Sequence, residues 1–357
     1  MTKPVPVFDG HNDFLLRLLH APERREELWL KGTEEGQLDL PRMKAGGFAG
    51  GFFAIWVPTP EAVGGTVDLG ALDRAMNNPP FAMPLPAEVP YEQALPVAMA
   101  EVGHLLWMER TGTLSICRSV ADIRAAMAAG RIAAILHMEG AEAIGTDLDA
   151  LHVWHAVGLR SLGPVWSRPT AFAHGVPFAF PSSPDTGDGL TGAGKDLVRE
   201  CNRLKIMLDL SHLNEKGFDD IAAISDAPLV ATHSNAHAVT PSSRNLTDRQ
   251  LAMIRESRGM VGLNYAVGFL RPDGLGAAFE GWDPVLRHLD HLIGQLGEDH
   301  VGLGSDFDGA TMPADLRDVA GLPRLLDALR AYGFGEELVE KIAHRNWLAV
   351  LGRVWGE

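Results

Sequence analysis

A His-x-Asp triplet lies close to the start of the chain, at the end of a short apolar run. The run reads VPVFDGHND over residues 5–13. Side chains alternate between the two faces of a strand, so His11 and Asp13 are expected to point the same way. An imidazole and a carboxylate side by side can chelate one divalent cation, and mixed nitrogen and oxygen ligands suit Zn²⁺. The triplet therefore predicts half of a metal site.

Further apolar runs along the chain also end in a histidine or an acidic residue. Their terminal residues are Glu139, His212, His233 and Asp306. Each alone has a simpler explanation: a hydrogen-bonded structural histidine, a loop-capping glutamate, or an aspartate in an N-cap or Asx-turn. Few structural explanations account for the order His-x-Asp, Glu, His, His, Asp. We therefore interpret the set as the site of a metal-dependent hydrolase.

This set contains enough ligands for two metal ions. We expect His11 and Asp13 to bind one ion, and His212 and His233 to bind the other. The carboxylate of Glu139 is expected to bridge the two ions. A carboxylate suits the bridge because its two oxygens can reach two ions, and two ions that share a water make hydroxide available near neutral pH. Asp306 would be the general base that orients this water and passes its proton to the leaving group.

These residues must be brought together by the elements that carry them. Strands are expected at residues 5–9, 51–57, 113–116, 132–138, 160–166, 205–211, 229–233, 260–265 and 301–305. Helical patterns lie between or after them, at residues 91–111, 120–129, 148–157, 195–203, 215–225, 248–256, 283–296, 322–333 and 336–354. Such alternation implies right-handed βαβ units and a parallel sheet. About eight or nine units predict an α/β fold of the (β/α)₈ TIM-like barrel type rather than a doubly wound sheet. No Gly-x-Gly-x-x-Gly motif directly follows a predicted strand and opens a helix, which removes the main support for nucleotide binding.

We expect a single domain over residues 1–357, with loop insertions at the C-terminal rim of the barrel. Residues 59–90 and 167–194 are rich in Pro and Gly and follow predicted strands. In barrels of this type, the loops after the strands build the active site. The two insertions are therefore expected to border the metal site.

Composition excludes several classes of partner. The formal net charge is −15, from 31 Lys+Arg against 46 Asp+Glu, which argues against nucleic acid and anionic membranes. The two cysteines, Cys117 and Cys201, cannot form a disulfide framework or a cysteine-rich zinc site. We find no signal-peptide pattern, no apolar run of about 18 residues and no lipid-anchor signal. These features predict a cytoplasmic enzyme.

Taken together, the motifs resemble those of the membrane dipeptidase family (renal dipeptidase, peptidase M19), within the amidohydrolase-like metal-dependent hydrolases. The motifs that carry the resemblance are DGHND at 9–13, EG at 139–140, DLSH at 209–212, THSN at 232–235, SRN at 243–245, GSDFDG at 304–309 and NW at 346–347. The resemblance spans essentially the whole chain. It implies a zinc-dependent dipeptidase, usually a homodimer, with the five ligands named above and Asp306 as the proton-handling acid. It also implies that a D-residue at the C-terminal position of the dipeptide, or a β-lactam, is accepted by some members.

Residues for substrate binding follow from the same resemblance. Arg244 could hold the substrate carboxylate with two hydrogen bonds, and the alternative is a surface arginine. Mammalian members carry a histidine where this chain has Trp166, which cannot become a cation. His174 is near enough in sequence to substitute for it. Asn264 and Tyr265 fall where the mammalian enzymes place an aromatic residue against the substrate.

Other histidines and other functions were weighed against this reading. His137 shares a face with Glu139 and is interpreted as a packed core histidine, with a role beside the metal ligands as the alternative. Histidines within predicted helices are expected at the surface or in packing, namely His104, His152, His155, His288 and His291. The rival functions are hydrolysis of another small amide, β-lactam or lactone at the same two metals, and a metal-binding scaffold without catalysis.

Overall fold

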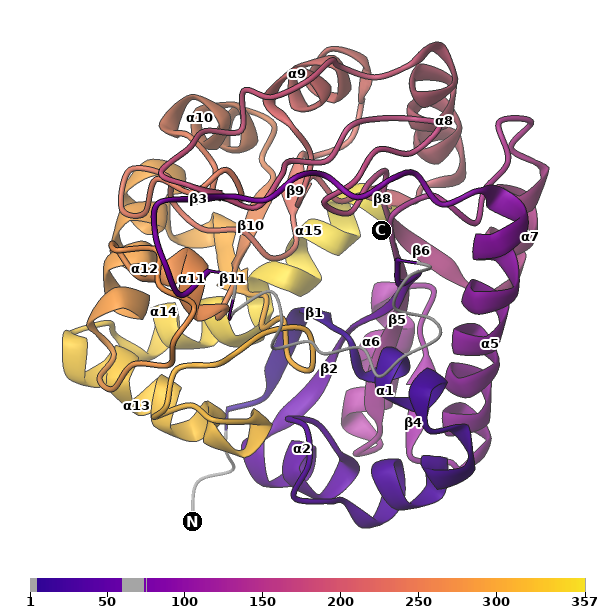
Figure 1. The fold of residues 1–357 in the computed structure, drawn as a ribbon. Helices are drawn as coiled ribbons and strands as arrows, with labels where there is room; N and C mark the ends of the chain where they lie inside the picture. Colours follow the sequence, from indigo (N-terminus) through magenta and orange to yellow (C-terminus); the bar gives the residue numbers. More distant parts are fainter. Residues whose placement is uncertain (1–4, 60–73, 75, 357) are drawn as a thin grey trace.

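The computed structural model describes residues 5–59, 74 and 76–356, and its parallel strands form a nearly closed barrel surrounded by helices (Figure 1). In chain order, the barrel strands are β1 (Val7–Asn12), β2 (Phe48–Trp56), β5 (Ile132–Glu139), β6 (Leu159–Gly163), β8 (Met207–Leu208), β9 (Val230–Ala231), β10 (Met260–Leu263) and β11 (Val301–Leu303). Strand β1 pairs with both β2 and β11, and a parallel bridge between Asp209 and Val230 joins the segments of β8 and β9. The predicted TIM-like barrel is confirmed.

The strands of the barrel are buried on both faces. Every residue of β1 and β5 is buried, as expected for parallel strands covered by helices outside and filled by side chains inside. The predicted strand at 113–116 forms as β4 (Leu114–Ile116), but it pairs only with β5 beside the N-terminal half of that strand. Since β6 pairs with the C-terminal half of β5, strand β4 extends the sheet without entering the barrel.

Helices cover the outside of the barrel. Their bounds are α1 (Phe14–His20), α2 (Leu40–Gly46), α5 (Tyr91–Arg110), α6 (Val120–Ala128), α7 (Asp149–Val157), α8 (Gly192–Leu204), α9 (Glu215–Ile224), α10 (Asp248–Glu256), α11 (Val267–Leu270), α12 (Asp283–Leu296), α13 (Leu322–Tyr332), α14 (Glu336–Glu340) and α15 (Asn346–Trp355). Helix α10 begins with a capping box between Thr247 and Gln250. None of the helices among the described residues combines the length and the hydrophobicity needed to cross a membrane.

Several element boundaries differ from the sequence predictions. The helix expected at 336–354 is divided into α14, a π-helical stretch at Lys341–Arg345, and α15. The strands expected at 205–211 and 229–233 are reduced to β8 and β9, because the polar residues that follow pair with side chains instead of a sheet ladder. Helices α1 and α2 lie in a stretch for which no helix was predicted.

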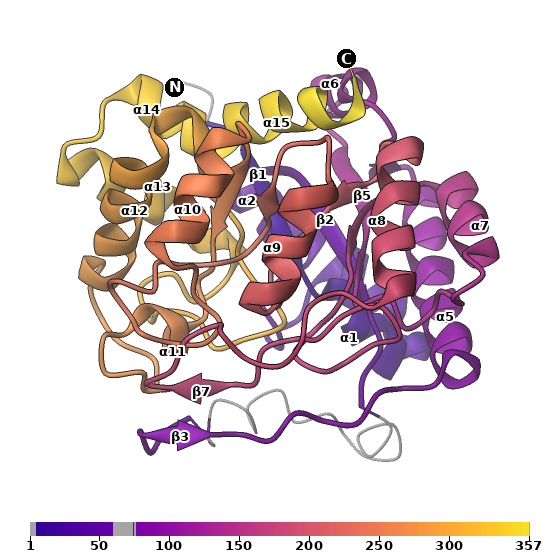
Figure 2. The same cartoon turned by 90° about the horizontal axis from the view of Figure 1, so that it is seen from above.

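Helix α15 closes the N-terminal end of the barrel, as Figure 2 shows. Its Trp347 is fully buried and donates a hydrogen bond from Nε1 to the carbonyl of Leu303 in β11, at 2.9 Å. The indole packs where strands β1 and β10 carry Gly10 and Gly262, and a Cβ at either glycine would come within 3.0 Å of the Trp347 ring. Glycine at these positions therefore lets the last helix pack directly under the strands.

At the opposite end, two long loops meet across the C-terminal rim (Figure 2). Strand β3 (Phe81–Ala82) pairs antiparallel with β7 (Ala179–Phe180), and the rings of Phe81 and Phe180 stack with centroids 6.3 Å apart. These strands belong to the insertions expected at 59–90 and 167–194. Residues 60–73 and 75 of the first insertion lie outside the described residues.

Candidate metal centre and active site

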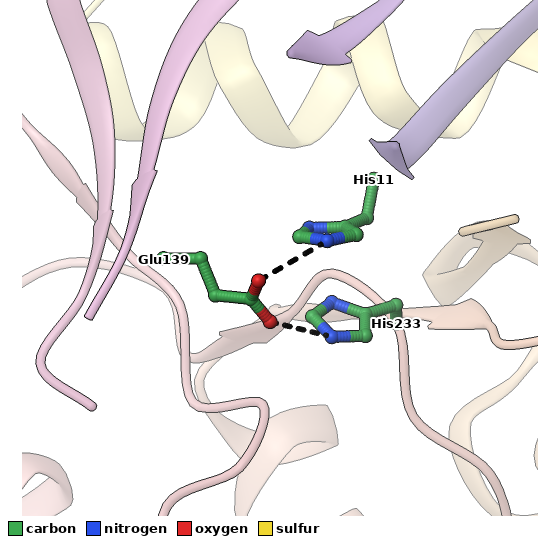
Figure 3. A group of neighbouring side chains, drawn as sticks. All are labelled: His11, Glu139 and His233. Atoms are coloured by element: carbon green, nitrogen blue, oxygen red, sulfur yellow. Dashed lines mark ion pairs between the residues drawn. The ribbon is translucent and has the colours of Figure 1, made fainter. Parts of the chain in front are cut away.

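Three histidines meet the carboxylate of Glu139 inside the C-terminal end of the barrel (Figure 3 shows two of them). Glu139 Oε2 lies 3.6 Å from His11 Nε2, whereas Oε1 lies 3.0 Å from His212 Nε2 and 3.4 Å from His233 Nε2. All four residues are buried. The two oxygens of Glu139 therefore face different histidines, which is the arrangement required of a bridging carboxylate.

Two acidic residues complete the cluster on the other side of His11. Asp13 Oδ2 lies 3.4 Å from His11 Nε2. One possible ligand atom from each of His11, Asp13 and Asp306 lies within 4.8 Å of the others, and the same holds for His11, Glu139 and His233. The two groups share His11 and together hold four of the five predicted metal ligands along with Asp306. The fifth ligand, His212, joins them through Glu139 Oε1.

Buried charges shape the protonation of this cluster. Burial raises the pKa of Glu139 well above its ordinary value, although the positive charge of His11 opposes that rise. Burial disfavours a charged His11, but the nearby carboxylates of Glu139 and Asp13 outweigh it and raise the pKa of His11 to about 10. Burial lowers the pKa of both His212 and His233 well below the ordinary value, so these two imidazoles are neutral.

The donor set fits a divalent metal. Neither ring nitrogen of His11 has a hydrogen-bond partner among the described residues, although both are buried. The Nε2 atoms of His212 and His233 lie only 3.1 Å apart and point at the same carboxylate oxygen of Glu139. Neutral imidazole nitrogens and carboxylates crowded together in this way are the ligands that Zn²⁺ takes in catalytic sites. A cation between them would satisfy His11 Nε2, the nitrogen that faces Asp13 and Glu139.

Asp306 is held in a fixed orientation beside the cluster. It follows β11, and its Oδ2 accepts a hydrogen bond from Asn264 Nδ2 at 2.8 Å. Asn264 is itself fixed, because its Oδ1 accepts from the backbone N–H of Ala266 at 2.6 Å. Burial, together with the charge of Asp13, raises the pKa of Asp306. A buried carboxyl with a raised pKa is a group that can chemically take and return a proton.

Arg244 places a buried positive charge next to the cluster. It is only 4% exposed, and it donates from Nη2 to the carbonyl of His233 at 3.0 Å. It forms no ion pair with a carboxylate of the described residues, and its Nε has no hydrogen-bond partner among them. Burial lowers the pKa of Arg244 to about 10. A buried guanidinium with no carboxylate in direct contact is a strong binding group for an anion.

An aromatic wall connects the histidines to this arginine. The Trp166 ring lies 5.9 Å from the His212 ring, 5.6 Å from Phe178 and 5.1 Å from Trp56, centroid to centroid. Phe178 stacks on Phe269 at 5.9 Å. The guanidinium of Arg244 lies 5.5 Å from the centre of the Phe269 ring. Trp166 thus begins an apolar surface that runs from the predicted metal ligands to the buried positive charge.

Three other residues considered from the sequence lie in surroundings unlike those of the metal ligands. Tyr265 is buried in the core with its ring against Phe307, and its hydroxyl has no hydrogen-bond partner among the described residues. His137 is a fully buried histidine whose Nδ1 lies 2.8 Å from Ser161 Oγ, and burial lowers its pKa to about 3. The side chain of His174 is half-buried, and its backbone carbonyl accepts a hydrogen bond from Asn214.

Sequence reasoning assigned no role to several buried polar residues around the cluster. Asp209 and Thr232 lie behind His233, and Ser167 Oγ lies 2.8 Å from His212 Nδ1. Behind Trp166, Arg168 forms a fully buried ion pair with Glu142, at 2.6 Å between Nε and Oε1. The one available signal was the placement of Asp209 inside an apolar strand run, where an acidic residue needs buried partners.

A parallel barrel whose C-terminal rim gathers histidines and carboxylates in this way defines the class of metal-dependent hydrolases. Comparison with known proteins narrows the class. The membrane dipeptidase family (peptidase family M19) matches residues 1–356, and the chain belongs to this family. It is accordingly a hydrolase that acts on dipeptides, and its family and buried cluster imply a metal.

Similar individual proteins agree with this assignment. A metallopeptidase from Rhodobacter sphaeroides, solved with a phosphinate mimic of the dipeptide L-Ala-D-Ala, is 67% identical with a TM-score of 0.96, covering 99% of this chain and 100% of that one. The dipeptidase tcpJ of Claviceps purpurea is 27% identical over 351 residues, which are 97% of this chain and 76% of the relative. A Klebsiella pneumoniae protein from the pqqA 5′ region is 50% identical over 244 residues, which are 68% of this chain and 90% of that protein.

Proposed function

We propose that the chain is a zinc-dependent dipeptidase that uses two zinc ions to hydrolyse the peptide bond of dipeptides. The observation that carries this proposal is the position of Glu139, whose two oxygens face His11 on one side and His212 and His233 on the other. His11 and Asp13 would hold one ion. His212 and His233 would hold the second, and Glu139 would bridge both.

Two bound zinc ions would polarise the peptide carbonyl and lower the pKa of a water shared between them. The chain itself supplies the proton transfer. Asp306, held by Asn264, would accept the proton released from the attacking water and deliver it to the departing amine. Its raised pKa suits this exchange, because a carboxyl that titrates closer to neutrality both takes and returns a proton.

Substrate orientation would come from Arg244 and the aromatic wall. The buried guanidinium has no carboxylate partner among the described residues, so the free C-terminal carboxylate of a dipeptide would complete it. Trp166 lies between His212 and Phe178, where it would contact the side chain of the C-terminal residue. Asn264 would act through Asp306, and Tyr265, whose buried ring packs against Phe307, would support the site from the core.

The structure bound to an L-Ala-D-Ala mimic suggests a stereochemical preference for this chain as well. The Rhodobacter enzyme that holds the mimic is 67% identical to this chain over nearly the full length of both. We therefore propose that dipeptides with a D-residue at the C-terminal position are substrates. Trp166, in place of the histidine of mammalian members, keeps a second candidate open, namely another small amide or lactone hydrolysed at the same metals.

A dipeptide panel combined with metal analysis tests this proposal. The purified enzyme should contain two zinc ions per chain, lose hydrolysis of the panel after chelation, and regain it when zinc is returned. The panel should include paired L,L and L,D dipeptides and their C-terminal amides. Intact bound zinc without cleavage of any panel member would refute the dipeptidase and favour the second candidate.

A further inference from the structure

His233 is tied to a buried carboxylate through a single hydroxyl group. Its Nδ1 atom lies 2.8 Å from Thr232 Oγ1, which in turn lies 2.5 Å from Asp209 Oδ2. All three residues are buried. A carboxylate has no proton to give and a hydroxyl has only one, so Thr232 must donate to Asp209. The Thr232 oxygen can then only accept from His233, which places a proton on Nδ1.

The orientation of Asp209 leaves this chain of hydrogen bonds no freedom to reverse. Its other oxygen, Oδ1, accepts from the backbone N–H groups of Thr232 at 2.8 Å and Ser211 at 3.0 Å. These two donors belong to the segments that follow β9 and β8, so the carboxylate also fastens the two strand ends together. Backbone donors cannot change roles, and Oδ2 is therefore fixed toward Thr232.

We propose that Asp209 and Thr232 are positioning residues that hold His233 in the Nδ1–H tautomer, so that the lone pair of Nε2 faces the metal centre. This inference rests on the proposed function, since a histidine ligates a metal through an unprotonated nitrogen. The Nε2 atom of His233 lies 3.4 Å from Glu139 Oε1, toward the cluster. A proton on Nε2 would occupy the position that a metal needs.

The second histidine of this pair has no such anchor. His212 Nδ1 lies 2.8 Å from Ser167 Oγ, and within the described parts of the chain this hydroxyl makes no hydrogen bond to a carboxylate. Ser167 can therefore donate or accept, and it leaves both tautomers of His212 available. The buried anion thus fixes only His233 of the two, and His233 is expected to be the preorganised ligand of its ion.

Asp209→Asn provides the sharpest test, because the new amide should reverse the donor and acceptor roles along the hydrogen bonds from residue 209 through Thr232 to His233. The two backbone donors hold the side-chain oxygen at the Oδ1 position, so the new NH₂ group must occupy the Oδ2 position and donate to Thr232. Thr232 would then donate to His233 Nδ1, and the proton of His233 would move to Nε2. We expect zinc affinity to fall by roughly 10–100-fold, the usual effect of losing such a partner.

Thr232→Val and Thr232→Ser form a matched pair for the hydroxyl. Valine keeps the shape of the buried side chain but removes the link, whereas serine keeps the hydroxyl and removes a methyl group. We expect Thr232→Val to lose zinc affinity to a similar extent as Asp209→Asn, roughly 10–100-fold. Thr232→Ser should retain the affinity of the wild-type chain.

Two measurements separate this role from general stability. The tautomer of His233 is read from imidazole ¹⁵N shifts of the metal-free, histidine-labelled protein, with the signal assigned by a His233→Asn variant. Zinc affinity is measured by titration against a competing chelator. The inference is supported if wild type and Thr232→Ser show Nδ1–H and bind zinc equally, while Asp209→Asn shows Nε2–H, Thr232→Val loses the preference for Nδ1–H, and both of these variants bind zinc more weakly.

Three results would overturn the inference. They are an Nε2–H tautomer in the wild-type protein, an unchanged zinc affinity in Asp209→Asn and Thr232→Val, and an equal loss in Thr232→Ser and Thr232→Val. A wild-type chain that binds no zinc would instead contradict the proposed function. The tautomers of the metal-free proteins would still decide the role of Asp209 and Thr232.

Discussion

Two of the side chains at the site, His212 and Asp306, project from left-handed backbone. Their φ angles are 65° and 62°, a region that residues with a Cβ rarely adopt. Such conformations persist where the surrounding structure enforces them, and they concentrate at functional sites. The sharp change of direction after β8 and β11 aims both side chains at Glu139 and Asp13 instead of along the strand.

Replacing Asp306 by Asn should abolish proton transfer without disturbing the cluster. We expect kcat to fall by about 10²–10⁴-fold, the usual contribution of a general acid–base group, with bound zinc unchanged. The measurement is steady-state hydrolysis of a dipeptide alongside metal analysis of the same preparation. A variant with wild-type kcat would remove Asp306 from its proposed role, whatever its metal content.

Replacing Arg244 by Lys should weaken recognition of the free carboxylate. A lysine keeps the charge but loses the paired donors of the guanidinium, so kcat/KM for a dipeptide should fall by roughly 10–100-fold. The C-terminal amide of the same dipeptide serves as the control substrate, since it lacks the anion. An equal loss for acid and amide would show that Arg244 does not read the carboxylate.

The metal-site residues could be predicted from the sequence because strands alternate with helices and these residues come at or near the strand ends. Each predicted ligand lies in a strand or within four residues of its end, and parallel strands bring their C-terminal ends to one rim. These ligands are His11, Asp13, Glu139, His212 and His233. The hydrogen bonds behind them could not be predicted, because each joins residues from different strands. Asp209 meets Thr232 only once β8 and β9 lie side by side.

At the scale of elements, α12 is anchored to the loops of the barrel by a buried histidine. His288 Nδ1 accepts from the backbone N–H of Ala236 at 3.1 Å, and its Nε2 lies 3.1 Å from the carbonyl of Leu270. Nδ1 must therefore be unprotonated while Nε2 carries the proton. Burial lowers the pKa of His288 to about 3. Of the two roles predicted for this histidine, surface or packing, its complete burial in α12 shows packing.

This histidine should make the stability of the fold depend on pH. In the unfolded chain His288 titrates near pH 6.5, whereas in the folded chain it titrates near pH 3. Its contribution is therefore fully present above pH 6.5 and is lost as the pH falls toward 3, by at most about 1.4 kcal/mol per pH unit. Denaturant unfolding at pH 7 and pH 5 should show a smaller difference for His288→Gln than for wild type. An unchanged difference would mean that His288 is not the titrating group.

Where the hydrophobic periodicity was strong, the elements begin and end where the sequence predicted. Where it was weak, pairing between strands decided the outcome. The amphipathic run of α12 begins and ends as predicted, at Asp283 and Leu296. The β4 strand has the apolar character of a barrel strand, yet it pairs beside β5 outside the barrel. Its short length leaves the rest of the β5 edge for β6, and a single sequence does not reveal which strand takes which part of an edge.

At the scale of the whole molecule, the barrel depends on the helix that covers its N-terminal end. Phe8 of β1 and Phe52 of β2 belong to the same buried cluster as Trp347 of α15. The Trp347 and Phe52 rings lie 5.0 Å apart, centroid to centroid. This interior cluster lies in the same barrel as the metal centre, at the opposite ends of strands such as β1.

Truncating Trp347 to Ala should destabilise the whole barrel. Removing a fully buried indole leaves a cavity beneath the strands, with an expected loss of about 3–5 kcal/mol in the free energy of unfolding. Chemical denaturation of the purified variant measures this loss. Trp347→Phe, which fills part of the cavity, should lose less, and equal losses in both variants would point to the Nε1 hydrogen bond to Leu303 as the main contribution.

The position of α15 also imposes an order on biosynthesis. Translation releases β1 and His11 more than 330 residues before the helix that packs beneath Gly10. Until residues 346–355 have left the ribosome, strand β1 lacks its contact with Trp347. His11 is then carried by a strand whose core packing is incomplete. Metal loading is therefore expected to follow release of the nascent chain, and ribosome-bound chains that stop before α15 are expected to depend on chaperones rather than on zinc.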